Sequence, residues 1–89
     1  MSEIVKRAAA GTLESSDVYV ELEPGDAGIE IELDSVVAQQ FGDEIRRVVG
    51  EVLAEQGVTN AKLRVVDRGA LDCVIRARVE TAIVRAKGE

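Results

Sequence analysis

Residues 18–34 read VYVELEPGDAGIEIELD, and this stretch decides the fold because two alternating segments flank a turn signal. In residues 18–23 and 29–34 every second residue is aliphatic, which is typical of strands with one buried face. Between them, Pro24 restricts φ and Gly25 accepts positive φ, so a turn is predicted there. We therefore predict two strands that pair as an antiparallel hairpin, with the carboxylates of both strands on its outer face.

The apolar residues then change to helical spacing. Between residues 37 and 53 they recur at intervals of three and four, which predicts one buried stripe on a helix of about five turns. Phe41 belongs to this stripe and is expected to be buried. Asp34 or Ser35 can cap the start of the helix, and Gly57 is placed to end it.

The C-terminal third alternates again. A third strand is predicted at residues 62–67, whereas residues 71–86 fit two patterns. Alternation through Val79 favours a fourth strand and then a short helix to about Lys87, but the same apolar residues also fit one face of a longer helix. The expected fold class is α+β, a small antiparallel sheet with a long helix packed on one face. Its order is ββαββα, with ββαβα and a longer C-terminal helix as the alternative.

Length and composition restrict the class of protein. The 89 residues indicate one domain, 1–89, in which residues 1–16 show no clear period and are predicted to form an exposed arm. The net charge of −6 argues against nucleic acid and anionic membranes as partners, because both require a concentrated positive surface. The single cysteine allows no internal disulfide, and neither a signal peptide nor a membrane span is recognisable. We expect a soluble, cytoplasmic protein.

Negative charge is concentrated in the first half of the chain. No Lys or Arg occurs between Ala8 and Ile45. This pattern predicts either a solvated acidic face of the sheet or a docking surface for a basic protein. The carboxylates of this stretch are Glu14, Asp17, Glu21, Glu23, Asp26, Glu30, Glu32, Asp34, Asp43 and Glu44.

The residue types present leave little room for catalysis. The chain has no histidine, which removes the usual general base near neutral pH and, with a single cysteine, argues against a zinc site. Cys73 lies on the apolar side of its alternating segment and is predicted to be a buried core residue. We therefore predict no catalytic residue and no metal ligand. The class of function that remains is the covalent attachment of a cofactor to the protein. Ser15 offers a hydroxyl for such an attachment in the loop-forming segment 11–17, although a segment of this composition is otherwise an ordinary loop.

Three segments together resemble the acyl carrier (gamma) chain of citrate lyase: AGTLESSD at 10–17, QFGDEIR at 40–46 and GALDCVIRARVE at 69–80. The resemblance covers nearly the whole chain and implies a non-catalytic carrier subunit. In that family the serine of the Gly-Thr-Leu-Glu-Ser motif carries 2'-(5''-phosphoribosyl)-3'-dephospho-CoA through a phosphodiester, and the matching residue here is Ser15. The family pattern has Gly at the next position, where this chain has Ser16, so Ser16 is the second candidate.

The resemblance also implies partners. In the family, a transferase attaches the phosphopantetheine-like group, and its thiol holds an acetyl thioester. The alpha chain exchanges acetyl for citrate, and the beta chain cleaves the citryl thioester, in the fermentation of citrate by a hetero-oligomer. Three alternatives stay open: the carrier subunit of malonate decarboxylase, that of citramalate lyase, and an unmodified interaction module whose acidic hairpin is the functional surface.

Overall fold

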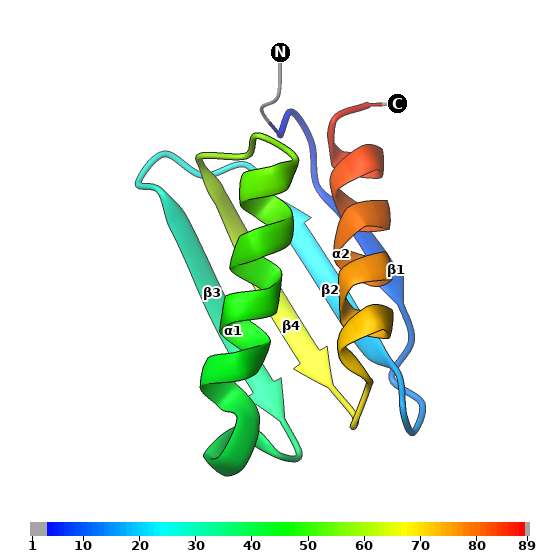
Figure 1. Cartoon of the computed structure of the whole chain (residues 1–89). Coiled ribbons are helices and arrows are strands. Elements are labelled where there is room, and N and C mark those ends of the chain that lie inside the picture. The colour runs from blue at the N-terminus through cyan, green and yellow to red at the C-terminus, as the bar shows by residue number, and fades with distance from the viewer. Residues whose placement is uncertain (1–3, 89) are drawn as a thin grey trace.

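The three strands predicted at residues 18–23, 29–34 and 62–67 are present in a computed structural model that describes residues 4–88 (Figure 1). The four strands form one sheet, and both helices lie on the same face of it. Aliphatic side chains between the helices and the sheet form the core, so the α+β prediction is confirmed. The elements are β1 (Ala8–Gly11), β2 (Val18–Glu23), β3 (Ile29–Ser35), α1 (Ala38–Glu55), β4 (Ala61–Asp67) and α2 (Asp72–Ala86).

The sheet is mixed, and the predicted hairpin between β2 and β3 is wrong. The strand order is β1-β2-β4-β3, so β4 lies between the two strands that were expected to pair. β2 runs antiparallel to both β1 and β4, whereas β3 runs parallel to β4. The parallel pair is connected through α1, because parallel neighbours need a crossover longer than a hairpin turn.

Charge favours the position of β4 between the two acidic strands. Its Lys62 pairs with Glu23 on one side and Glu30 on the other, and the residue two positions on, Arg64, is likewise flanked by glutamates. A direct β2–β3 hairpin would set carboxylates beside carboxylates, which is unfavourable across strands. The basic residues of the third predicted strand therefore separate the two acidic strands.

The expected exposed arm is shorter than predicted. Ala8–Gly11 pairs with β2 as an edge strand, Ala10 is buried, and the N–H of Val5 donates to the carbonyl of Ala86 at 3.0 Å. Alanines and a glycine show no apolar period, but their backbone still satisfies its hydrogen bonds along the edge of β2. Within the predicted arm, residues 12–16 are exposed, and residues 1–3 lie outside the described residues.

Residues 72–86 form one helix, so the predicted fourth strand is wrong and the alternative with a longer C-terminal helix is confirmed for this segment. Its buried residues are Ile75, Val79, Ala82, Ile83 and Ala86, at helical spacing. Cys73 is exposed, which corrects the prediction that it is buried. Residues 72–86 are helical rather than a strand because this helix covers the inner faces of β1 and β2, which α1 does not cover. Neither described helix is long and apolar enough to cross a membrane.

Candidate functional site

Ser15 lies in the loop of residues 12–17 that connects β1 to β2. This loop is at the end of the molecule where β3 and β4 finish and both helices begin (Figure 1). Ser15 and Ser16 are both exposed, and within residues 4–88 neither hydroxyl makes a hydrogen bond. The loop therefore presents two free hydroxyls to solvent at one end of the sheet.

Gly11, the last residue of β1, directly precedes this loop and tolerates no side chain. Its φ is +95°, and a Cβ built on it would lie 1.9 Å from the carbonyl oxygen of Val18. Only glycine combines this left-handed conformation with so close a backbone approach. The glycine of the GTLES segment is therefore a steric requirement of the turn.

Asp17 holds the other end of the loop. Its carboxylate accepts hydrogen bonds from Thr12 Oγ1 at 2.6 Å, from the N–H of Val18 at 2.7 Å, and from Nε and Nη2 of Arg78 at 3.1 and 2.9 Å. These donors lower the pKa of Asp17 from the usual 3.8 to about 2, with Arg78 the largest cause and Thr12 the next. The Asp17 side chain is 15% exposed. It thus ties the loop to α2 through a charge-assisted, bidentate contact.

Ser16 is held by its backbone rather than by its hydroxyl. Its N–H donates to the carbonyl of Arg68 at 2.8 Å, and the N–H of Arg68 donates to the carbonyl of Asp17 at 2.9 Å. Ser16 has a φ of +67°, a left-handed conformation that residues with a Cβ rarely adopt. This conformation is the physical reason why glycine suits the position that Ser16 occupies.

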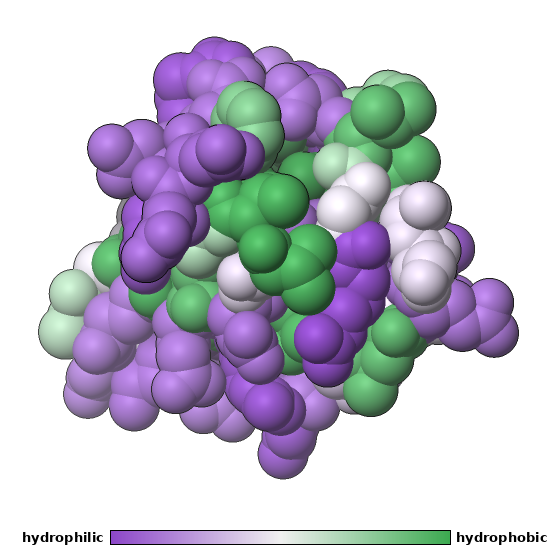
Figure 2. Space-filling model, turned by 90° about the horizontal axis from the view of Figure 1, so that it is seen from below, coloured by the Kyte–Doolittle hydropathy of each residue, from purple (hydrophilic) through white to green (hydrophobic). Residues whose placement is uncertain are grey.

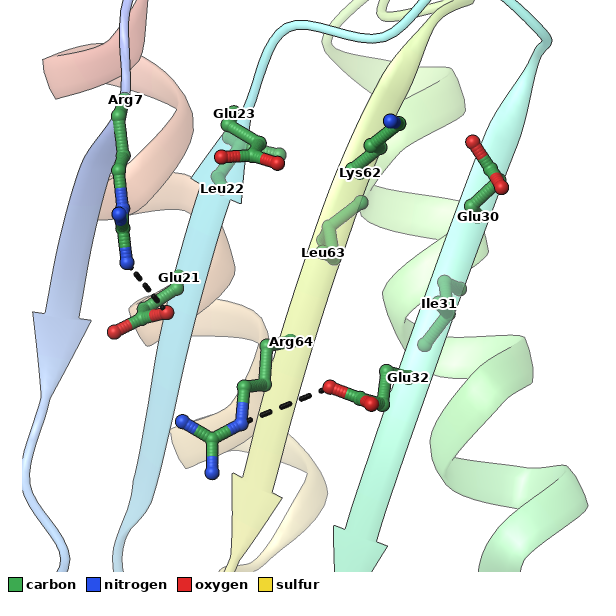
Figure 3. A pocket seen from close by; sticks show the side chains of 10 residues that line it. All are labelled: Arg7, Glu21, Leu22, Glu23, Glu30, Ile31, Glu32, Lys62, Leu63 and Arg64. Carbon is green, nitrogen blue, oxygen red and sulfur yellow. Dashed lines mark hydrogen bonds and ion pairs between the residues drawn. The ribbon is translucent and has the colours of Figure 1, made fainter.

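On the face of the sheet that no helix covers, carboxylates of the acidic stretch lie beside basic side chains. Figure 3 shows Arg64 of β4 reaching Glu32 of β3, with 3.7 Å between Nε and Oε2, and Arg7 reaching Glu21 of β2 at 3.0 Å. A shallow hollow of about 490 Å³ lies over these side chains. Basic residues from outside the acidic stretch therefore interleave with it, so the face is not a continuous negative surface.

Tyr19 adds a further contact on this face. Its hydroxyl donates to Oε2 of Glu21 at 2.9 Å. This bond raises the pKa of the Tyr19 hydroxyl and, together with the smaller effect of Arg7, lowers the pKa of the Glu21 carboxyl. The carboxylate is thus held as an acceptor between two donors, which is a structural role.

No cluster of side chains suited to metal binding occurs in the described part of the chain. Within residues 4–88, no group of three or more His, Cys, Asp or Glu side chains is placed to hold a metal ion. The functional candidates remain the two serines of the loop.

The end of the molecule beside this loop carries exposed apolar side chains that the sequence pattern did not predict. Phe41, expected in the buried stripe of α1, is 52% exposed, and Leu71, just before α2, is 71% exposed. The position of Phe41 in the first turn of the helix was the available signal. The start of α1, the loop before α2 and the loop between β1 and β2 lie at the same end of the fold (Figure 1).

The chain is similar to known proteins in sequence and in structure. A family model described as ACP, "Malonate decarboxylase delta subunit (MdcD)", matches residues 5–86. The citrate lyase acyl carrier protein of Haemophilus influenzae (strain PittEE) is 56% identical over 86 residues, which cover 97% of this chain and 90% of that protein. The protein of the same name from Escherichia fergusonii is 56% identical over 85 residues, covering 94% and 88%. Among solved structures, a chain of a Pseudomonas malonate decarboxylase hetero-tetramer in complex with malonate has a TM-score of 0.79 at 26% identity, covering 91% of this chain and 84% of that chain.

Proposed function

This chain belongs to the citrate lyase acyl carrier protein family, and on that premise we propose that Ser15 covalently carries 2'-(5''-phosphoribosyl)-3'-dephospho-CoA. One observation carries the proposal: the Ser15 hydroxyl is exposed and without a hydrogen-bond partner in residues 4–88, on a turn that is otherwise firmly held. A phosphodiester requires an accessible hydroxyl, so the residue fits the group. When attached, the group supplies a thiol on which acyl groups are held as thioesters.

The two ends of the loop around Ser15 are held in place, whereas Ser15 itself is exposed. Gly11 and Asp17 hold the two ends of the turn, whereas Ser15 between them is exposed. Because the ends of the loop are held, the point at which a long tethered arm starts is defined. Tethering raises the effective concentration of the acyl group at each partner's site. Ser15 is preferred to Ser16 because it occupies the serine position of the motif, while Ser16 occupies the glycine position.

We propose that the carrier serves the alpha and beta chains of citrate lyase within a hetero-oligomer. The carrier would move acetyl and citryl thioesters between the acyl transferase site of the alpha chain and the lyase site of the beta chain. The names of the relatives support this assignment. The structural neighbour is a subunit of a hetero-tetramer, which supports a role inside a larger assembly. The absence of histidine agrees with catalytic groups that lie on the partners.

Intact mass spectrometry tests the attachment. The chain is produced together with the other proteins of its lyase, including the prosthetic-group transferase, and the mass should increase by that of one group. Ser15→Ala should abolish the increase and the lyase activity of the assembly, whereas the matched control Ser16→Ala should retain both. A mass increase that survives Ser15→Ala but disappears in Ser16→Ala would move the site to Ser16.

The carrier subunit of malonate decarboxylase is the second candidate, because a subunit of that enzyme shares the fold over 91% of this chain. The citrate lyase relatives are favoured by identities of 56% against 26%. Complementation distinguishes the two: the carrier should restore citrate cleavage in a strain that lacks its own carrier, and should fail to restore malonate decarboxylation. An unmodified interaction module would instead retain its function in the Ser15→Ala variant.

A further inference from the structure

One arginine beside the attachment loop has no partner for its side chain. Arg68 is exposed, and within residues 4–88 its guanidinium makes no hydrogen bond or ion pair. Every other arginine of the chain pairs with a carboxylate or donates to a backbone carbonyl oxygen. A guanidinium carries several N–H donors and a permanent positive charge. Arg68 is therefore available to an anion that is not one of the carboxylates of the described residues.

The backbone of Arg68 is bonded to the attachment loop. Its N–H donates to the carbonyl of Asp17 at 2.9 Å, and its carbonyl accepts from the N–H of Ser16 at 2.8 Å. These bonds continue the antiparallel pairing of β2 with β4 by one residue beyond Val18 and Asp67. The point from which the Arg68 side chain starts is thus fixed beside the residues that follow Ser15.

Ser15 lies at the tip of a turn on the other side of these bonds. The N–H of Asp17 donates to the carbonyl of Glu14 at 3.2 Å, so Ser15 and Ser16 are the two central residues of a β-turn. The φ of +67° at Ser16 suits the third residue of a type II turn. Figure 2 looks at this end of the molecule and shows hydrophilic residues beside apolar ones. Ser15 and Arg68 are both exposed at this end.

A phosphodiester on Ser15 would add a negative charge to a loop that is already acidic. Glu14 and Asp17 belong to this loop, and no Lys or Arg does. Arg78 is already engaged, because its Nε and Nη2 donate to the Asp17 carboxylate at 3.1 and 2.9 Å. Neighbouring charges of one sign repel each other unless a cation lies close by. Within residues 4–88, Arg68 is the arginine bonded to this loop whose charge is not yet paired.

We propose that Arg68 binds the phosphodiester through which Ser15 carries its prosthetic group. The planar guanidinium donates two N–H groups to the non-bridging oxygens of the phosphate, a pairing that arginine favours over lysine. The contact holds the first link of the arm beside the end of β4, and the rest of the arm stays free to reach a partner's site. The proposal rests on the proposed function, because it takes Ser15 as the attachment residue.

The melting temperatures of the modified and unmodified carrier test this contact. Production with and without the prosthetic-group transferase gives the two forms, and intact mass identifies each. At low salt, the change in melting temperature on attachment should be more favourable in the original chain than in Arg68→Gln by about 2–5 °C. Lys62→Gln removes the same charge at the opposite end of β4 and is the matched control, with the same change on attachment as the original chain. Comparing two forms of one variant cancels the effect of the substitution on the unmodified fold.

Nuclear magnetic resonance gives a second measurement that requires only the original chain. The Nε–H resonance of Arg68 should shift on attachment, and the shift should diminish in 1 M salt, because salt screens an exposed ion pair. The Nε–H resonance of Arg76, which is paired with Glu51 and Glu55, should stay in place. This measurement decides the question even if the transferase does not modify Arg68→Gln.

The possible failures are distinguishable. A carrier that gains the mass of the group, but whose Arg68 resonance stays in place on attachment, overturns the contact and leaves the attachment proposal intact. Equal destabilisation of both forms by Arg68→Gln also overturns the contact, since Arg68 then acts within the loop, for example on Glu14. The absence of any mass increase in the original chain would refute the attachment to Ser15 and the contact with it.

Discussion

Asp17→Asn is expected to lower the free energy of unfolding by about 2 kcal/mol at pH 7. The amide stands for a protonated carboxyl, so the variant loses the preference of the site for the charged form. That preference appears as the lowering of the Asp17 pKa from 3.8 to about 2. At about 1.4 kcal/mol per pH unit this corresponds to roughly 2.5 kcal/mol. Because the Arg78 side chain is 41% exposed, screening reduces the value to about 2 kcal/mol.

The sign of the pH dependence follows from the lowered pKa. The contribution is fully present above the unfolded value of 3.8 and is lost as the pH falls through the folded value of about 2. The difference between the original chain and Asp17→Asn should therefore shrink to roughly half by pH 3. Urea denaturation followed by circular dichroism measures it at pH 7 and at pH 3. At pH 7 the melting temperature should fall by about 8–16 °C, as expected for a domain of this size.

Two controls define the result that would refute this reasoning. Asp26→Asn changes an exposed aspartate in the loop between β2 and β3 and should alter stability by less than about 0.5 kcal/mol. A double-mutant cycle with Arg78→Gln should show a coupling of at least about 1 kcal/mol. A coupling near zero, or a stability difference that is as large at pH 3 as at pH 7, would mean that the contact between Asp17 and Arg78 does not stabilise the loop.

Three other substitutions test the loop and the sheet. Ser16→Gly should raise the free energy of unfolding by about 0.5–1 kcal/mol in urea denaturation, because glycine relieves the left-handed φ of +67°, whereas Ser16→Ala should give no gain. Gly11→Ala should lower the free energy of unfolding by at least about 2 kcal/mol and shift the backbone amide resonances of β1, because the alanine Cβ would overlap the carbonyl oxygen of Val18. Amide resonances that stay in place would contradict the steric requirement for glycine. Arg64→Glu should lower stability by about 1 kcal/mol at low salt by placing an acid between the glutamates of β2 and β3, and an effect that persists undiminished in 1 M salt would argue against charge pairing.

The candidate site was partly predictable from sequence. The position of Ser15 in the GTLES motif and the loop-forming residues around it were sufficient to select it as the attachment residue, which stays a prediction. The interactions that hold the loop were not predictable, because Arg78 and Arg68 are more than fifty residues away from Asp17 in the chain. The exposed apolar side chains beside the loop were also missed. Phe41 continues the apolar stripe of α1, but it lies in the first turn of that helix and is 52% exposed.

By itself the sequence determined the local conformations: the alternation in residues 18–23, 29–34 and 62–67, the apolar stripe of α1, and the α+β class. These follow from periods of two and 3.6 residues, which are properties of each segment alone. The tertiary structure decided which strands pair and what residues 72–86 become. Pairing depends on Lys62 and Arg64, which belong to a later strand, lying between two acidic strands. Residues 72–86 satisfy both periods in part, and they became a helix because the inner faces of β1 and β2 required a cover that only this segment was left to provide.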